Sequence, residues 1–223
     1  YKFLPKNNHP LTNLDNIFDK QYVNYTNKKK FFNKNIYFHL KKNFKSRKEI
    51  KFLDYGGENI DLYLYLRDKF PKIHITIVNQ PILNLYLNKF LKKHNIKYIE
   101  VLSSEIKLKK LKFDYVNFGS SLQYIKNYDH VLKILLNKNI KFFNISATSF
   151  FEDKSSFKMF IVKQVNLLPT VMYCYFFNLN YIKFLFDKYD YKIKQKKVNP
   201  FTKINFSNFN IKIKHLDILL KKS

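Results

Sequence analysis

The sequence is short of glycine, alanine, arginine and tryptophan. It has 3 Gly and 0 Trp, its arginines are Arg47 and Arg67, and its one alanine is Ala147. Lys, Asn, Ile, Phe and Tyr take their place, and all five have codons rich in A and T. A genome biased toward A and T therefore accounts for this composition without any functional demand.

The scarcity of arginine bears on the formal net charge of +26. Clustered Lys and Arg indicate phosphate binding, but arginine is the residue that recognises guanine and forms bidentate hydrogen bonds with phosphate. The lysines here are spread along the whole chain. We therefore expect a solvated lysine surface and no nucleic-acid partner, and we keep RNA binding or RNA modification as an alternative.

Cysteine and long apolar runs are scarce as well. Cys174 is the single cysteine and cannot form an intramolecular disulfide, which predicts an inert core thiol and a reducing cytoplasm. Apolar runs break off well before the ~18 residues that a membrane span needs, and the start does not resemble a signal peptide. The histidines are scattered without metal-ligand spacing, so we expect no metal site.

Apolar residues are plentiful enough for a sizeable core. Hydrophobic residues make up 46% of the 223 residues, with 24 Phe and 17 Tyr. This length predicts one main domain, at 46–223, with a small N-terminal helical arm or lid at 1–45. Within the arm we expect one or two short helices around Leu14 to Tyr22, a loop at 24–30 and a helix at 31–44.

From Ile50 the pattern alternates between strand-like and helix-like segments. The expected strands are 50–53, 73–78, 96–102, 113–118 and 140–145, and the expected helices between them are 59–69, 81–93 and 122–137. Such alternation predicts right-handed βαβ units on a parallel sheet. An irregular insertion at 149–170, a helix at 180–188 and an antiparallel hairpin of 191–198 with 209–220 follow. The expected fold is a Rossmann-like α/β fold with a seven-stranded, mostly parallel sheet and helices on both faces.

Small or polar residues follow each expected parallel strand. They are Asp54, Tyr55, Gly56, Gly57 and Glu58, then Asn79 and Gln80, then Ser103 and Ser104, then Gly119, Ser120 and Ser121, then Ser146 and Thr148. Ligands of open α/β sheets bind at the carboxyl ends of the strands. Two of the three glycines stand together at Gly56–Gly57, where the backbone must turn tightly or approach a ligand closely. The pattern favours a nucleotide-like cofactor, although an ordinary polar turn would fit the spacing of the glycines alone.

Three short motifs carry a resemblance to a known family. Asp54-Tyr55-Gly56-Gly57, Val78-Asn79-Gln80-Pro81 and Gly119-Ser120-Ser121-Leu122-Gln123-Tyr124-Ile125 stand in this order along the chain. From about Ile50 to Leu220 the sequence resembles class I methyltransferases that use S-adenosylmethionine. More narrowly, it resembles a bacterial family of methyltransferase-like proteins often encoded among surface-polysaccharide genes.

The resemblance implies roles for individual residues. Asp54, Gly56 and Gly57, with Tyr55, would line the methionine end of S-adenosylmethionine, and Asn79 and Gln80 its ribose. Ser103, Gly119, Ser120, Ser121 and Gln123 would complete the cofactor site, with Ser120 and Gln123 at the mouth of the active site. The chain departs from the family pattern at Glu58, which replaces a third glycine, and at Asn79, where the family has glutamate.

The implied reaction is methyl transfer to a small molecule or a sugar-containing, glycan-type intermediate. A base for it is expected in the loops after the fourth and fifth strands, where Asp129, His130, Glu152 and Asp153 are the titratable candidates. Ser120 and Ser121 lack the Gly-x-Ser-x-Gly elbow of a hydrolase. Glu58 and Asn79 keep open a second interpretation, a binding or scaffold protein with this fold and no chemistry.

Overall fold

The computed structural model describes residues 14–28, 35–44, 49–102, 105–154, 158–167, 170–199 and 211–223. Ser103 and Ser104, the first part of the predicted arm and the turn predicted around Pro200 lie outside these residues. The chain forms two compact units, one within Leu11–Lys107 and the other within Leu108–Ser223. Each is described by itself below.

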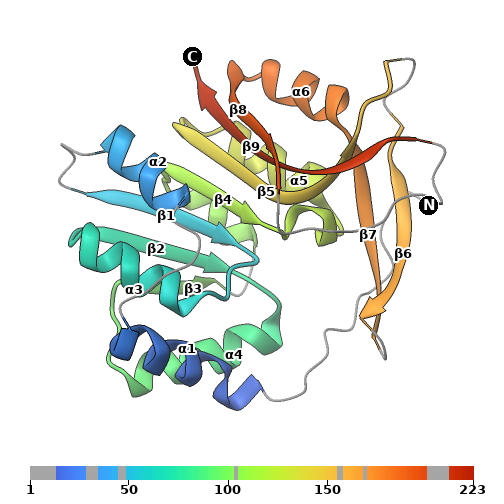
Figure 1. Cartoon of the computed structure of the whole chain (residues 1–223). Helices are drawn as coiled ribbons and strands as arrows, with labels where there is room; N and C mark the ends of the chain where they lie inside the picture. Colours follow the sequence, from blue (N-terminus) through green and yellow to red (C-terminus); the bar gives the residue numbers. More distant parts are fainter. Residues whose placement is uncertain are drawn as a thin grey trace. The chain divides into compact units, whose positions relative to one another are not determined.

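The first unit contains a three-stranded parallel sheet and its helices (Figure 1). In chain order its elements are α1 (Leu14–Lys28), α2 (Asn35–Phe44), β1 (Ile50–Tyr55), α3 (Ile60–Lys69), β2 (Ile73–Val78), α4 (Pro81–Lys93) and β3 (Ile99–Leu102). β1 pairs with β2 and β2 with β3, all in parallel. β1 and β2 are buried at five of their six positions, as expected for parallel strands covered on both faces.

Helix α1 belongs to the predicted arm and packs on α3 and α4. Phe18 contacts Phe90, and Tyr25 Oη donates to Asp68 Oδ2 at 2.7 Å. The amide N–H of Ile60, the first residue of α3, donates to Gln21 Oε1 at 2.7 Å. α1 thus satisfies a backbone donor that the start of α3 would otherwise leave unpaired. The loop predicted at 24–30 was wrong for Asn24 to Lys28, because this last turn of α1 is held by its contacts with α3.

The second unit is built around β5. Its elements are β4 (Tyr115–Gly119), the 3₁₀ helix η2 (Leu122–Tyr124), α5 (Tyr128–Leu136), β5 (Phe142–Phe151), β6 (Phe160–Leu167), β7 (Thr170–Asn178), α6 (Leu179–Asp187), β8 (Tyr191–Val198) and β9 (Ile213–Lys222). A further 3₁₀ helix, η1 (Glu105–Lys110), spans the boundary between the units. β5 is parallel to β4 and antiparallel to β9, and β9 is antiparallel to β8. The predicted antiparallel pairing of the two C-terminal strands is confirmed.

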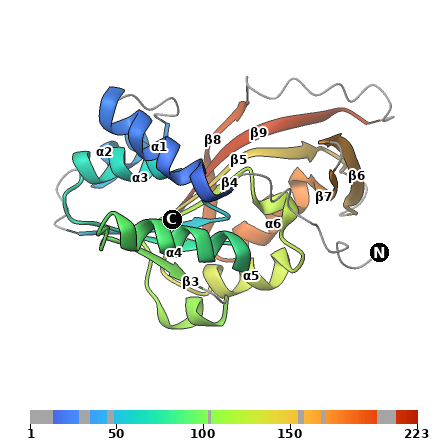
Figure 2. The ribbon, with the colours of Figure 1, turned by 90° about the horizontal axis from the view of Figure 1, so that it is seen from below.

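The prediction of an irregular insertion at 149–170 was wrong. β6 and β7 form an antiparallel hairpin there, in which Val162 lies opposite Cys174, and β7 also joins β5 in parallel at Phe150 and Phe177. Figure 2 shows β7 and β6 at the arrowhead end of β5. β-branched and aromatic residues in both segments stabilise this hairpin once a neighbouring strand is present to pair with.

The helix predicted at 122–137 is interrupted. Ile125 N donates to Leu122 O and Tyr128 N to Ile125 O, which are the short-range bonds of a 3₁₀ helix and a turn. α5 begins only after them, with Asn127 as its N-cap residue. β5 in turn runs six residues past the predicted end at Ile145, because β9 and β7 continue to pair with it.

The described chain therefore has the expected mixed α/β fold, with a mostly parallel sheet and antiparallel C-terminal strands. The predicted number of seven strands was wrong: the described residues form nine, because β6 and β7 occupy the segment predicted to be irregular. Cys174 is buried, and burial raises the pKa of its thiol to about 12, in line with the expected inert core thiol. Among the described residues, no helix is long and apolar enough to cross a membrane.

Candidate functional site

The turn after β1 is closed by its own backbone. Gly56 has φ 78°, in the left-handed region that glycine adopts at no steric cost, and its N–H donates to Val78 O at 2.6 Å. The end of β1 is thereby tied to the end of β2. The predicted tight turn at this glycine pair is present.

Gly57 is fixed by a buried side-chain pair beneath it. Tyr63 Oη in α3 donates to Asp54 Oδ2 at 2.8 Å, and both residues are buried. A Cβ at Gly57 would collide with the Tyr63 hydroxyl and the Asp54 carboxyl group. Glycine is therefore required at 57 by packing inside the protein, independently of any ligand.

Asn79 bonds within the same turn through both ends of its amide. Its Nδ2 donates to Gly57 O at 2.9 Å, and its Oδ1 accepts from Gln80 N at 2.8 Å. The residue predicted to contact a ribose thus also links the ends of β1 and β2. Gln80, its exposed neighbour, is the N-cap residue of α4.

Asn84 is a polar residue of this region that the sequence analysis missed. It is buried in the first turn of α4, and its Nδ2 donates to Asn79 O and Leu102 O, each at 3.0 Å, at the ends of β2 and β3. Within the described residues its Oδ1 has no hydrogen-bond partner. The signal in the sequence was an asparagine in the first turn of the helix that follows the second strand.

Tyr55, at the end of β1, donates its hydroxyl hydrogen to Glu105 Oε1. Burial, followed by the bond to Glu105, raises the pKa of the Tyr55 phenol far above its ordinary value, so the hydroxyl stays protonated. The structure thus brings Asp54, Tyr55, Gly56, Gly57, Asn79 and Gln80 to one edge of the first unit. Ser103 lies outside the described residues.

The predicted residues of the second unit gather at the ends of β4 and β5. Gly119 ends β4, and Ser120 follows with φ 58°, donating its N–H to Ser146 O at 2.9 Å. Ser121 is the N-cap residue of η2. Gln123 is buried in η2 and donates Nε2 to Ala147 O at 3.3 Å.

Two buried polar residues of β9, Asp217 and His215, were also missed, because their partners in β5 lie 70 and 66 positions away in the chain. Asp217 Oδ1 accepts from Ala147 N at 2.9 Å and from Asn199 Nδ2 at 2.8 Å. Ser149 Oγ lies 2.9 Å from His215 Nε2, and both residues are buried. Burial lowers the pKa of the His215 imidazole, which favours its neutral form near pH 7.

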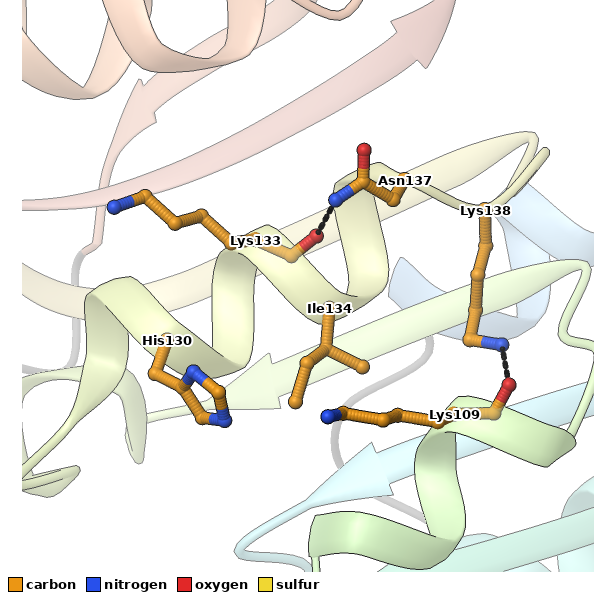
Figure 3. A pocket seen from close by; sticks show the side chains of 6 residues that line it. All are labelled: Lys109, His130, Lys133, Ile134, Asn137 and Lys138. Carbon is orange, nitrogen blue, oxygen red and sulfur yellow. Dashed lines mark hydrogen bonds between the residues drawn. The ribbon is translucent and has the colours of Figure 1, made fainter.

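The predicted bases Asp129 and His130 lie on α5. Asp129 forms an ion pair of 2.6 Å with Lys133, which raises the pKa of that lysine. His130 lines a hollow of about 430 Å³ between η1 and α5, where it points toward Lys109 across Ile134 (Figure 3). Its described neighbours in this hollow are mostly cationic, and Lys138 Nζ donates there to Lys109 O at 2.8 Å.

The other two predicted bases follow β5. The exposed Glu152 pairs with Lys196 at 3.2 Å, and the backbone carbonyl of Asp153 accepts from Asn178 Nδ2 at 2.9 Å. The structure does not gather the four candidates at one point, so each stays a prediction. Among the described residues, no group of three His, Cys, Asp or Glu side chains could hold a metal ion.

Several solved structures share this architecture with the chain. No protein-family model matches the chain, and no curated protein matches its sequence. The chain is similar to the N-terminal domain of EvdMO1 with SAH bound, at a TM-score of 0.56 and 12% identity over 92% of this chain and 80% of that one. It is also similar to TehB from Haemophilus influenzae, at a TM-score of 0.57 and 16% identity over 94% and 67% of the two chains. The chain has a methyltransferase fold.

A third similar structure agrees over the full length of its own chain. It is an S-adenosylmethionine-dependent methyltransferase from Clostridium acetobutylicum, with a TM-score of 0.55 and 14% identity over 95% of this chain and 100% of that chain. At such identities the likeness shows the fold alone. It confirms the Rossmann-like α/β class expected from the sequence.

Proposed function

We propose that the protein transfers a methyl group from S-adenosylmethionine to a small molecule or a sugar-containing intermediate in the cytoplasm. The observation that carries the proposal is the methyltransferase fold over more than nine-tenths of the chain, with the Gly56 turn at the end of β1. A structure of the N-terminal domain of EvdMO1 was obtained in the presence of SAH and D-fucose, which supports a sugar-type acceptor. A role in surface-polysaccharide synthesis rests on the sequence resemblance.

The strand-end residues of the first unit fit a nucleoside with an amino acid tail. Gly56 and Gly57 present backbone without side chains at the end of β1, where a methionine end would lie. Gln80 is exposed at the start of α4, and the Oδ1 of Asn84 is a buried acceptor without a partner among the described residues. Hydroxyl and amino donors of a nucleoside are the groups that such acceptors bind.

S-adenosylmethionine supplies, when bound, a methyl group on a sulfonium that is already electrophilic. The work of the protein is to hold the acceptor in line with this methyl group, to exclude water and to accept a proton from an acceptor hydroxyl. The loop from Gly119 to Gln123 is held to β5 by the bonds of Ser120 N to Ser146 O and of Gln123 Nε2 to Ala147 O, and it would help to position the acceptor.

Isothermal titration of the full chain with S-adenosylhomocysteine, the demethylated product, tests the cofactor. We expect micromolar binding and a raised melting temperature. Gly56→Val should abolish binding, because a β-branched residue cannot adopt φ 78° without strain. If S-adenosylhomocysteine at millimolar concentration produces no heat of binding and no shift of the melting temperature, the proposal is overturned.

Gln80→Ala is the alternative test of cofactor binding if Gly56→Val does not fold. Loss of one neutral hydrogen bond should weaken binding by about fivefold without changing the melting temperature, because Gln80 is exposed. Asn88→Ala, which removes another exposed amide from α4, is the matched control and should leave affinity unchanged. Equal affinities for both variants would mean that the cofactor binds elsewhere.

A binding or scaffold protein without chemistry is the second candidate. It is favoured by Asn79, whose amide is bonded to Gly57 O and Gln80 N, where the resembling family has a ribose-gripping glutamate. A neutral amide also binds a hydroxyl less strongly than a carboxylate does. Binding of S-adenosylhomocysteine without methyl transfer to any acceptor would support this candidate. The RNA alternative gains nothing from the strand-end turns, since 54–58, 79–80 and 119–124 contain no Lys or Arg.

A further inference from the structure

Gln123 holds an unpaired acceptor inside the second unit. The residue is 3% exposed, and its Nε2 donates to Ala147 O, but its Oε1 has no hydrogen-bond partner among the described residues. A buried carbonyl oxygen without a partner is destabilising, and native proteins keep few of them. The position of Gln123 therefore calls for a reason beyond folding.

Gln123 follows β4 and bonds to β5, and the backbone is strained near the end of the first strand and within the second. Ser120 after β4 has φ 58° and Ala147 in β5 has φ 49°, both in the left-handed region that favours glycine. Ser120 N bonds to Ser146 O, and Asp217 Oδ1 holds Ala147 N at 2.9 Å. Strain maintained by surrounding bonds is typical of sites that bind or position a ligand.

The β6–β7 hairpin packs against the same loop. Tyr124 Oη donates to Gln164 Oε1 of β6 at 2.9 Å, and Tyr175 Oη of β7 donates to Lys126 O at 3.2 Å. Tyr124 also packs, with Val162, on a buried apolar cluster that includes Phe151. The hairpin therefore packs on the loop that carries Gln123, through aromatic and apolar side chains and the amide of Gln164.

We propose that Gln123 Oε1 accepts a hydrogen bond from an uncharged hydroxyl group of the methyl acceptor, and that the β6–β7 hairpin forms one wall of the acceptor site. This inference rests on the proposed methyl transfer. A neutral amide oxygen suits a hydroxyl donor, whereas a buried ammonium group would need a carboxylate to compensate its charge. The ring of Tyr124 offers an apolar surface to the carbon skeleton of such an acceptor.

The unfolding temperature tests this role without any ligand. Gln123→Met keeps the volume of the side chain and removes both the unpaired Oε1 and the long bond of 3.3 Å from Nε2 to Ala147 O. The gain and the loss should offset each other, so the melting temperature should stay within about 2 °C of the wild type. Gln164→Met is the matched control and should lower the melting temperature, because Gln164 Oε1 accepts from Tyr124. A clear fall for Gln123→Met would show that the amide serves the fold and would overturn the inference.

Binding of neutral sugars tests the acceptor class. Methyl glycosides of common monosaccharides are probed by saturation-transfer NMR with the full chain saturated with S-adenosylhomocysteine. At least one should bind the wild type and bind Gln123→Met about fivefold more weakly, the worth of one neutral hydrogen bond. This inference assigns Gln123 to the methyl acceptor in place of the cofactor role that the resemblance implies, so the affinity for S-adenosylhomocysteine should be the same in both proteins.

The two hypotheses fail in different ways. Normal binding of S-adenosylhomocysteine with no bound glycoside, or with equal glycoside binding by both proteins, would overturn the role of Gln123 and leave the proposed function standing. Failure of the wild type to bind S-adenosylhomocysteine would overturn the proposed function and this inference with it.

Discussion

The turn after β1 and the turn after β4 both follow a parallel strand, yet they satisfy their polar groups differently. At the first, Gly56 adopts φ 78°, and Asp54, Tyr63 and Asn79 form hydrogen bonds within the turn. At the second, the left-handed residue is Ser120, and Gln123 keeps a buried oxygen without a partner among the described residues.

This difference separates a turn that is formed without a ligand from a turn that a ligand would complete. A turn whose donors and acceptors are paired internally is rigid and holds its shape without a ligand. A turn that keeps strain and an unpaired acceptor is stabilised when a ligand completes it. Substitutions at the two turns should therefore change stability in opposite directions.

Gly57→Ala is expected to have the largest effect. The new Cβ would collide with the Tyr63 hydroxyl and the Asp54 carboxyl group, and overpacking of this kind should cost about 3 kcal/mol of the free energy of unfolding. Urea denaturation measures it. Gly119→Ala is the control, because its Cβ would meet only Asn117 Nδ2 at 3.1 Å, and it should cost less than about 1 kcal/mol. Equal losses would mean that the first turn is not packed as described.

Tyr63→Phe should have the next largest effect. It removes a hydrogen bond to the buried Asp54 carboxyl group and should lower the free energy of unfolding by about 2 kcal/mol. Tyr98→Phe makes the same change at a buried hydroxyl that has no hydrogen-bond partner in the described chain. Thermal unfolding of Tyr98→Phe should match the wild type. If Tyr63→Phe leaves the free energy of unfolding unchanged, the turn after β1 is not stabilised by its internal hydrogen bonds as described.

Ser120→Gly should have the smallest effect, with the opposite sign. Relief of left-handed strain at φ 58° outweighs the added flexibility of the unfolded chain and should stabilise the protein by about 0.5–1 kcal/mol. Asn95→Gly, at φ 52°, is the control and should change stability less, because asparagine tolerates this conformation. If Ser120→Gly destabilises the protein in chemical denaturation, the turn after β4 is not strained.

Local patterns in the sequence predicted the alternating strands and helices from Ile50 and the C-terminal antiparallel pair. The same patterns predicted the glycine turn. Burial at alternating or consecutive positions and the backbone freedom of Gly56 are properties of short segments, so they can be read without knowing the partners. Asp54, Asn79 and Ser120 were named for the same reason, as residues next to strand ends.

Tertiary structure decided what those residues do. The β6–β7 hairpin forms because β5 extends to pair with β7, and Gln123 is buried because the hairpin packs on its loop. Asp217 reaches Ala147 across 70 positions of the chain, and Asn84 links the ends of β2 and β3. The sequence by itself determined the ends of β1, β2, β3 and β4 to within about two residues, but not the end of β5. Which polar atoms at those ends are paired among the described residues, and which are not, depends on residues far apart in the chain, and only folding brings them together.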